Sequence, residues 1–532
     1  MSSTNETDYE IGQDNVQLFG LDVHNPVFVI SGLTIIGFVL ITLMFQESAG
    51  AFFGWLRPAV TSTFDWFFLA SGNLFVLFAL FLVITPLGKV RLGGQDAVPD
   101  YSYVGWFAML FAAGMGIGLM FFGVSEPMSH FSSSMGGIAV GENGIRTDWA
   151  PLGAAAGNIE DARELAMAAT IFHWGLHPWA IYAVVALALA FFSFNKGLPL
   201  TFRSAFYPIL GERIWGWPGH VIDILAVFAT LFGLATSLGF GTSQALAGFN
   251  FLYGWGTGSV AIVVLITVIT AMALISVVRG LDGGVKVLSE VNMVLALVLL
   301  LFILFVGPTG EILSTAVTGA VGYVKNLIPL SMPFGREDVN FSQGWTSFYW
   351  AWWISWSPFV GMFIARVSRG RTVREFITCV ILVPTALCIL WMATFGGSAI
   401  SQVVADASAP VAAAAQELKL FVMVKDFPMT GLLSLVGIIL VLVFFVTSSD
   451  SGSLVIDTIT AGGKVDAPVT QRIFWCSFEG LVAITLLLVG GSAALSALQA
   501  MTVSTGLPFT IILLIMCYST WKGISEESKA LS

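Results

Sequence analysis

Charged side chains are scarce in this sequence, and their scarcity excludes whole classes of protein. Lysine and arginine number 22 and aspartate and glutamate number 32, so that 10% of the 532 residues are charged, against about 25% in an ordinary soluble domain. A soluble chain of this length would fold as two or three domains with polar surfaces, and these charges are too few to cover them. The net charge of −10 also provides no basic surface for nucleic acid.

Cysteine and histidine are equally sparse. The four cysteines lie inside apolar stretches, which argues against a disulfide framework or a zinc site. His173 and His177 stand one helical turn apart, a spacing that suits metal ligands, but no cysteine or carboxylate triad accompanies them, so a metal enzyme is not expected. The first 25 residues are polar and carry no lysine or arginine, and a cleavable signal peptide is therefore not expected either.

Long apolar runs are abundant instead. Hydrophobic residues make up 57% of the chain and the mean hydropathy is +0.88, which places the protein in a lipid bilayer. A helix needs about 20 mostly apolar residues to cross the hydrocarbon core. Twelve such runs are predicted, at residues 26–45, 61–86, 104–124, 167–194, 217–246, 258–278, 285–306, 345–366, 376–398, 431–456, 468–490 and 498–518. Two further segments, 199–214 and 310–330, are amphipathic and are expected at the membrane interfaces. The predicted fold class is an all-α integral membrane protein.

The basic residues of the loops predict the orientation. If the N-terminus is cytoplasmic, 15 of the 22 lysines and arginines fall on the cytoplasmic side, and such an excess of positive charge marks the inside. Both termini are therefore predicted to be cytoplasmic in a multi-pass protein of the plasma (inner) membrane. Four arginines of the loop at 366–374 are expected to hold the inner end of the eighth span, in contact with membrane lipid.

Two spans carry helix-breaking residues near mid-depth. The third contains Gly114, Gly116 and Gly118, each costing about 1 kcal/mol against alanine in a helix interior. Close helix packing is an alternative reason for Gly114 and Gly118, but Gly116 faces the other way and favours unwinding. The eighth contains Pro358, which removes an amide donor. We therefore predict that both spans are interrupted.

The two breaks stand five spans apart, and breaks at corresponding positions of two halves point to a transport site between inverted repeats. We predict a 5+5 repeat of spans 3–7 and 8–12 with two additional N-terminal helices. The predicted organisation is a polar cytoplasmic tail at 1–25, a single transmembrane domain at 26–518 and a short cytoplasmic tail at 519–532. Within the domain, the divisions are 26–103 (extra helices), 104–306 (first repeat), 307–344 (interfacial connection) and 345–518 (second repeat).

Aromatic side chains occur at an unusual depth in two spans. Tryptophan in membrane proteins is usually interfacial, but Trp352, Trp353 and Trp356 lead inward along the eighth span, and Trp174, Trp179 and Tyr182 lie within the fourth. Rings that merely fill the bundle are the alternative. A cage of rings binds a quaternary ammonium by cation–π attraction of about 0.5–2 kcal/mol for each good ring. Exposed amides of an unwound third span would meet an anionic group, so the pattern indicates a small zwitterion.

Four segments carry a family resemblance. They are AAGMGIGLMFFGVSEP (112–127), HWGLHPWAIY (173–182), YWAWWISWSPFVGMFIARVSRGRTVREF (349–376) and FFVTSSDSGS (444–453), and they resemble the betaine/carnitine/choline transporter family. The resemblance implies a leucine-transporter-type fold, a homotrimer and the transport of trimethylammonium compounds. The substrate-binding positions that it implies are Met115, Gly116, Trp174, Trp179, Tyr182, Trp352, Trp353 and Trp356.

The resemblance also implies sodium as the coupling ion, with no other cofactor. GMGIG is the form seen in sodium-coupled betaine-type members, whereas carnitine exchangers carry a different residue at the position of Met115. Sodium ligands are implied at Ala112, Met115, Phe444, Thr447 and Ser448, and ordinary interhelical hydrogen bonding is the less favoured alternative for the two hydroxyls. A second sodium site would use Thr230 and Phe359, but Leu234 stands where some members have a second threonine, which argues against that site.

The predicted function is sodium-coupled uptake of glycine betaine or a related onium osmolyte by alternating access. Dimethylsulfoniopropionate or choline as substrate, and sodium-independent or proton-coupled exchange, remain alternatives. Asp450 and Glu479 are candidate proton carriers because carboxylates inside the membrane are functional suspects, although buried structural hydrogen bonds explain them equally well. An enzyme acting on quaternary amines is disfavoured by the lack of a credible nucleophile or metal set, and a channel by the mid-depth aromatics.

Overall fold

The computed structural model describes residues 7–114, 116–279, 285–491 and 494–530. Apart from one antiparallel hairpin, β1 (Asn15–Leu18) and β2 (Leu21–His24), the named elements are helical. The α-helices are α1 (Val27–Met44), α2 (Gln46–Ile84), α3 (Tyr103–Gly114), α4 (Ile117–Met135), α5 (Ile159–Trp174), α6 (Leu176–Phe194), α7 (Tyr207–Leu210), α8 (Trp217–Tyr253), α9 (Ser259–Arg279), α10 (Val285–Val306), α11 (Thr309–Ser331), α12 (Val339–Phe341), α13 (Ser347–Arg366), α14 (Val373–Ala405), α15 (Pro410–Ala413), α16 (Lys419–Met423), α17 (Thr430–Thr460), α18 (Val469–Gly490) and α19 (Ala494–Ala530). Short 3-10 and π turns join several of them.

The described residues include 10 helical stretches that are long and apolar enough to cross a membrane, with α5 and α6 counted together as one. Each overlaps one of the twelve predicted runs, so the all-α membrane class is confirmed, while the count of twelve stays a prediction. The two remaining runs are the ones expected to be interrupted. Residues 104–124 are divided between α3 and α4. Most of residues 345–366 form α13, which is continuous from Ser347 but rich in tryptophan and serine.

The predicted break in the third span is present. Helix α3 ends at Gly114 and α4 begins at Ile117, with Gly116 between them in an extended conformation (φ −171°, ψ −175°). Met115, at the centre of the motif, lies outside the described residues. The glycine-rich motif therefore separates two helices and leaves the N-terminal amides of α4 without helical acceptors.

The predicted break at Pro358 is wrong, because α13 runs through the proline from Ser347 to Arg366. A proline leaves the carbonyl four residues earlier without its amide donor, here that of Ile354. The hydroxyl of Ser357 donates to this carbonyl over 2.7 Å and so supplies the missing partner. One of the two breaks on which the repeat prediction depended is thereby removed, and the repeats stay a prediction.

A second break lies in the fourth span instead. Helix α5 ends at Trp174 and α6 begins at Leu176, with Gly175 at the junction. A Cβ on Gly175 would lie 2.6 Å from the carbonyl oxygen of Ile171, so the close turn requires a glycine. The two broken spans are therefore neighbours in sequence, the third and the fourth.

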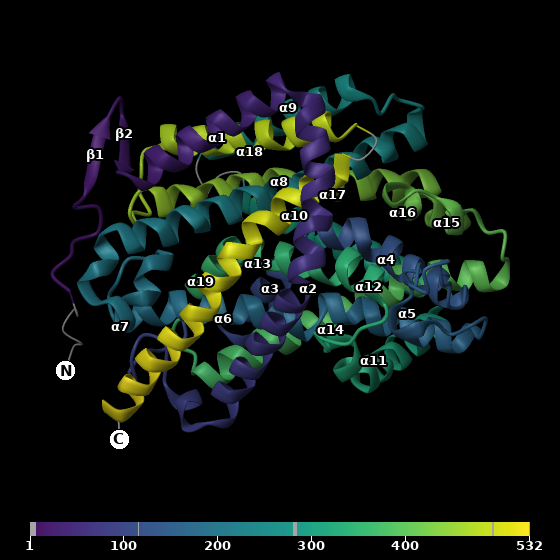
Figure 1. The fold of residues 1–532 in the computed structure, drawn as a ribbon, viewed down its shortest axis with the longest axis horizontal. Coiled ribbons are helices and arrows are strands. Elements are labelled where there is room, and N and C mark those ends of the chain that lie inside the picture. The colour runs from purple at the N-terminus through teal and green to yellow at the C-terminus, as the bar shows by residue number, and fades with distance from the viewer. Residues whose placement is uncertain (1–6, 115, 280–284, 492–493, 531–532) are drawn as a thin grey trace.

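The α5–α6 pair forms the centre of the bundle. Of its most apolar stretch, 94% is buried, compared with 33% for α9, whose outward valines and isoleucines suit lipid. Helix α6 packs on α13, and α13 also packs on α8 and α19. Figure 1 shows α13 and α6 within the bundle, with α19 crossing in front beside α2.

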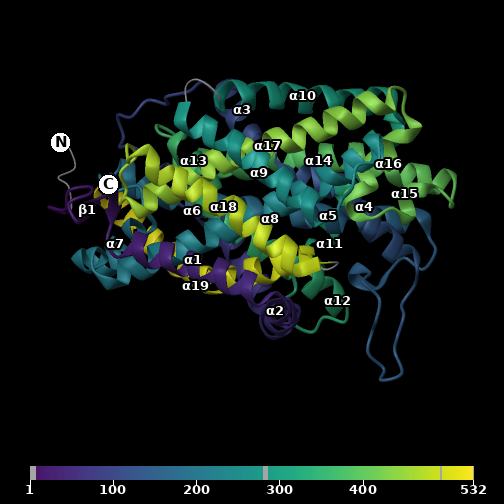
Figure 2. The same ribbon diagram turned by 90° about the horizontal axis from the view of Figure 1, so that it is seen from above.

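The described chain begins and ends at the same end of the molecule, near α7, while α15 and α16 lie at the other end (Figures 1 and 2). An even number of crossings would place the termini in this way. The described part of the predicted N-terminal tail is not free, because Asn15 Nδ2 donates to the carbonyl of Ala461 (2.9 Å) and Asp22 pairs with Lys464 (2.5 Å). The predicted C-terminal tail is a continuation of α19 as far as Ala530.

The two amphipathic segments differ in structure. Residues 310–330 form α11, which packs on α5 and α14. Residues 199–214 form short turns around α7 rather than one helix.

Candidate functional site

A cavity lies between α4, α6, α8 and α13, where the two helix breaks meet. Its lining residues are Ala113, Gly116, Ile117, Gly118, Leu119, Trp174, Pro178, Trp179, Tyr182, Ser237, Trp352, Trp353, Trp356 and Val360. Seven of the eight predicted substrate-binding residues are among them, and the eighth, Met115, lies outside the described residues. The structure thus brings these seven residues together, and substrate binding by them stays a prediction.

Helical spacing and the break at Gly175 together build the walls of this cavity. Trp352 and Trp356 are one turn apart on α13, and Trp179 and Tyr182 lie three residues apart on α6, so that each pair shares a helix face. Trp174 belongs to α5 and reaches the same cavity because α5 ends there. We call these five tryptophans, Trp174, Trp179, Trp352, Trp353 and Trp356, together with Tyr182, the aromatic box.

Trp353 makes both perpendicular and stacked ring contacts within the aromatic box. Trp353 lies edge-on to Trp174 (centroids 4.9 Å apart, planes at 79°) and to Tyr182 (5.9 Å, 82°), and it stacks on Trp352 (5.1 Å, 16°). On the α4 side, a Cβ at Gly118 would lie 2.9 Å from Trp174 and 3.0 Å from Trp352. The absence of a side chain there lets both indoles close over the start of α4.

Every indole N–H of the aromatic box is turned toward the protein. The donors and acceptors are Trp174 to Glu126 Oε2 (2.7 Å), Trp179 to the carbonyl of Trp174 (3.2 Å), Trp352 to Ser237 Oγ (3.2 Å), Trp353 to the carbonyl of His173 (2.9 Å) and Trp356 to the carbonyl of Gly233 (2.8 Å). These bonds fix the rings and leave their carbon faces to the cavity. The described lining residues include no lysine, arginine, aspartate or glutamate, so a ligand meets ring faces and backbone rather than formal charge.

The start of α4 favours a negatively charged group, whereas the ring faces favour a positively charged one. Gly116, Ile117 and Gly118 line the cavity at the N-terminus of a 19-residue helix. The first amides of a helix have no helical acceptors and carry a partial positive charge, which favours anions. The cavity therefore suits a small molecule with a methylated cation at one end and a carboxylate at the other.

A second cavity lies next to the first and holds most of the predicted sodium ligands. Ala112, Phe444, Thr447, Ser448 and Phe359 all line it. It shares the wall residues Ala113, Trp356 and Val360 with the first cavity. Residues of α3 and α17 thus line one cavity, in which the Thr447 hydroxyl donates to the carbonyl of Val443 (2.9 Å) in its own helix. Sodium binding there stays a prediction.

Thr230 is not part of this arrangement. It does not line the cavity that contains Phe359, and its hydroxyl donates to the carbonyl of Ala226 over 2.6 Å. Leu234, at the position of the missing second threonine, points toward α17, where a Cβ on Gly452 would lie 2.4 Å from it. The structure therefore does not assemble the second predicted sodium pair.

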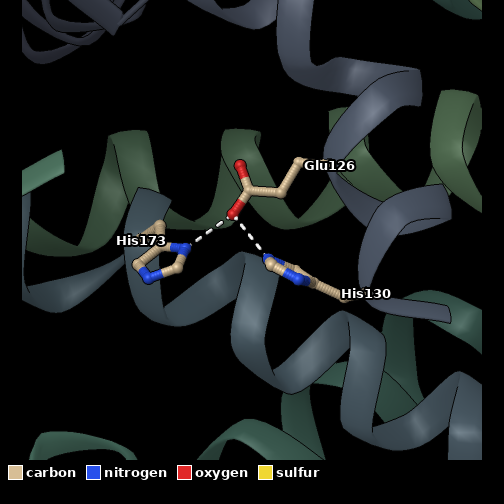
Figure 3. A group of neighbouring side chains, drawn as sticks. All are labelled: Glu126, His130 and His173. Atoms are coloured by element: carbon tan, nitrogen blue, oxygen red, sulfur yellow. Dashed lines mark hydrogen bonds and ion pairs between the residues drawn. The ribbon is translucent and has the colours of Figure 1, made fainter. Parts of the chain in front are cut away.

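A buried carboxylate that the sequence analysis missed lies behind the aromatic box. Glu126 on α4 accepts four hydrogen bonds: from His173 Nδ1 (2.6 Å) and His130 Nε2 (3.2 Å) on Oε1, and from Trp174 Nε1 (2.7 Å) and the Tyr349 hydroxyl (2.5 Å) on Oε2. Figure 3 shows both histidines directed at one oxygen of the carboxylate. The third span was predicted to end at residue 124, whereas α4 continues to Met135, which places Glu126 inside the bundle. Its spacing of four residues from His130 is the sequence signal that could have identified it.

Glu126, His130 and His173 lie close enough to hold a metal ion, with ligand atoms within 4.8 Å of one another. Hydrogen bonding accounts for the cluster more completely. The four donors fill the acceptor positions of the carboxylate, and Thr346 Oγ1 lies 2.9 Å from His173 Nε2. His177, which the sequence pairs with His173, bonds to Asn73 (3.0 Å) and stacks on Trp350, so that pair does not form a site.

The candidate proton carriers are engaged elsewhere. Asp450 pairs with Arg472 (2.6 Å) and accepts from Ser276 (2.7 Å), and Glu479 accepts from Ser449 (2.9 Å). Neither lines one of the two cavities. These contacts favour the structural alternative for both, and proton coupling stays untested.

The fold and the cavity define a class of protein: a multi-pass membrane protein with an aromatic cavity beside two broken helices. The chain belongs to the BCCT family of transporters, since residues 26–529 match the family model described as betaine/carnitine/choline family transporter. The predicted family is therefore confirmed. The prediction that the protein is a transporter and not an enzyme is confirmed as well.

Curated relatives are similar over nearly the whole chain. A glycine betaine/proline/choline transporter of Vibrio parahaemolyticus is 65% identical over 98% of this chain and 95% of its own length. Glycine betaine transporter 1 of the same organism is 56% identical over 99% of this chain and 98% of its own length. A glycine betaine/proline/choline/ectoine transporter, also from V. parahaemolyticus, is 54% identical over 99% of this chain and 92% of its own length.

Proposed function

We propose that this protein is a sodium-coupled secondary transporter that takes up glycine betaine, or a closely related zwitterionic onium osmolyte, by alternating access. The observation that carries the proposal is the aromatic box, in which all five indole N–H groups are hydrogen-bonded within the protein and ring faces surround the cavity. A quaternary ammonium has no N–H to donate and is bound by such faces. Its carboxylate would lie at the N-terminus of α4.

The choice of glycine betaine agrees with the names of the relatives, all three of which include it. Dimethylsulfoniopropionate places a sulfonium and a carboxylate at similar spacing and would fit the same surfaces. Choline lacks the carboxylate and would leave the α4 amides unused. Two of the relatives are also named for proline, so we expect a preference among several solutes rather than one exclusive substrate.

Sodium is proposed as the coupling ion because the second cavity joins oxygen-bearing groups of α3 and α17 and shares three wall residues with the substrate cavity. An ion bound there would fix the unwound backbone that contacts the substrate. A homotrimer in the plasma (inner) membrane, with lipid contacts and both termini cytoplasmic, completes the proposal.

A competition panel in proteoliposomes tests the substrate. Labelled glycine betaine uptake should be driven by an inward sodium gradient and inhibited by unlabelled glycine betaine and dimethylsulfoniopropionate more strongly than by choline or carnitine. Undiminished uptake when potassium replaces sodium would contradict sodium coupling and favour exchange or proton coupling. Choline as the strongest competitor would contradict the role given to α4.

A further inference from the structure

The buried carboxylate of Glu126 is the one charged partner among the acceptors of the five box indoles. The other four indoles donate to neutral oxygens, whereas Trp174 donates to Glu126 Oε2 over 2.7 Å. Glu126 is itself completely buried and does not line the cavity. It therefore lies one layer behind the ring that a ligand would touch.

The surroundings of Glu126 are built to hold a negative charge. Two imidazoles, an indole and a phenol each point a hydrogen-bond donor at one of its two oxygens. An ionised carboxylate has four acceptor positions, and these donors fill them. Among the described residues, its ion-pair partners are His130 and His173 and include no lysine or arginine. Each imidazole needs only one N–H to serve this bond, so the bonds themselves do not require a positively charged partner.

The same hydrogen bonds fix two of the rings around the cavity. Trp174 is a wall of the aromatic box. Tyr349 stacks against Trp353 (5.9 Å, 24°) and lies edge-on to Trp174 (5.7 Å, 71°). Because both donate to Oε2, one carboxylate oxygen sets the orientation of Trp174 and of the tyrosine that supports Trp353.

The charge also acts through the indole. A hydrogen bond from the indole N–H to an anion polarises the ring and makes its face more negative, and the field of a buried anion is weakly screened. Cation–π attraction depends on this negative face. A neutral head group of the same shape would gain packing from the ring but nothing from the charge.

We propose that Glu126 is a specificity-determining residue of the aromatic box: without touching the substrate, it orients Trp174 and Tyr349 and supplies the fixed negative charge that makes the box prefer an onium cation over a neutral group of equal size. The inference rests on the proposed function, because it assigns a cause to the cation preference of that site.

The test compares two ligands that differ only in charge at one end. Glycine betaine has a trimethylammonium head. The carboxylate tert-butylacetate, which is the anion of tert-butylacetic acid, has the same shape with carbon in place of nitrogen. Quenching of tryptophan fluorescence, with the purified full-length protein in detergent, measures the binding of each. We expect Glu126→Gln to bind glycine betaine about 10-fold more weakly, as loss of one charge-assisted interaction implies, and tert-butylacetate with an affinity within about twofold of the wild type.

Two further variants separate charge from fit. Glu126→Asp keeps the charge on a shorter side chain and should recover most of the preference for glycine betaine. Tyr349→Phe removes one donor but keeps the ring and the carboxylate, and should also retain the preference. Size-exclusion chromatography and thermal melting confirm that each variant is folded.

An equal loss of affinity for both ligands in Glu126→Gln would overturn the inference and assign a merely structural role to the carboxylate. An unchanged preference would also overturn it. Wild-type protein that binds no glycine betaine would instead contradict the proposed function itself, so the two failures are distinguishable. If Glu126→Gln does not fold, loss of the preference in Glu126→Asp, whose charge is retained, would overturn the inference.

Discussion

The indole N–H of Trp179 donates to the backbone carbonyl of Trp174 over 3.2 Å, across the break between α5 and α6. In an unbroken helix this carbonyl would accept from the amide of residue 178, which is a proline and has none. Pro178 therefore leaves this carbonyl free to accept from Trp179, and the two tryptophans, five residues apart across the break, both line the same cavity. The break at Gly175 and the positions of the Trp174 and Trp179 rings are therefore linked. A substitution at Gly175 tests this link.

Gly175→Ala should disturb this junction. The added Cβ would lie 2.6 Å from the carbonyl oxygen of Ile171, and relieving such a clash costs about 1–3 kcal/mol. We expect a lower melting temperature and weaker glycine betaine binding, measured by thermal unfolding and tryptophan fluorescence. Gly37→Ala in α1, where a Cβ would meet nothing within 4 Å, is the matched control and should change neither. Unchanged binding in Gly175→Ala would show that the break does not position the rings.

Ser357→Ala should destabilise α13. The hydroxyl is the partner of the Ile354 carbonyl that Pro358 leaves unpaired, and an unsatisfied buried group costs about 1–3 kcal/mol. Thermal unfolding in detergent measures the loss. Ser504→Ala removes a similar hydroxyl bond (2.7 Å) to the carbonyl of Ala500, but that carbonyl keeps its helical amide, so this control should lose much less. Equal effects of the two substitutions would refute the compensation at Pro358.

Thr447→Val should weaken sodium activation without destroying the fold. Thr447 lines the second cavity, and removal of an oxygen from an ion site lowers affinity by roughly 10-fold or more. The half-saturating sodium concentration for glycine betaine uptake in proteoliposomes is the quantity to measure. Thr485→Val is the matched control. Thr447 donates to the carbonyl of Val443 (2.9 Å) and Thr485 to that of Leu481 (2.7 Å), but Thr485 lines neither cavity. A sodium dependence that is the same in Thr447→Val and wild type would remove Thr447 from the proposed site.

The sequence was sufficient for the composition of the aromatic box. Spacing alone places Trp352 and Trp356 on one helix face, and Trp179 and Tyr182 on another. The three glycines from Gly114 to Gly118 predicted the break in the third span. The single Gly175 did not, because one glycine in an apolar run is a weak signal. Its effect depends on the close approach of Ile171, which only tertiary structure reveals.

The continuity of α13 and the role of Glu126 were not predicted either, for different reasons. Pro358 has the sequence signature of a break, but a side-chain hydrogen bond from its neighbour Ser357 compensates for it. Glu126 was not predicted to be buried in the bundle, because the apolar run ends at residue 124, before the carboxylate. Its importance depends on donors from α5 and α13 that are distant in sequence, and no local pattern predicts their meeting.

The most direct test of the account is sodium-driven uptake of labelled glycine betaine by Trp356→Leu in proteoliposomes. Trp356 lines both cavities, so its loss should abolish uptake while the protein remains folded in the membrane. Trp55→Leu, which replaces a 63% exposed ring on α2, should transport like the wild type. Normal glycine betaine uptake by Trp356→Leu would contradict the claim that the aromatic box binds the substrate.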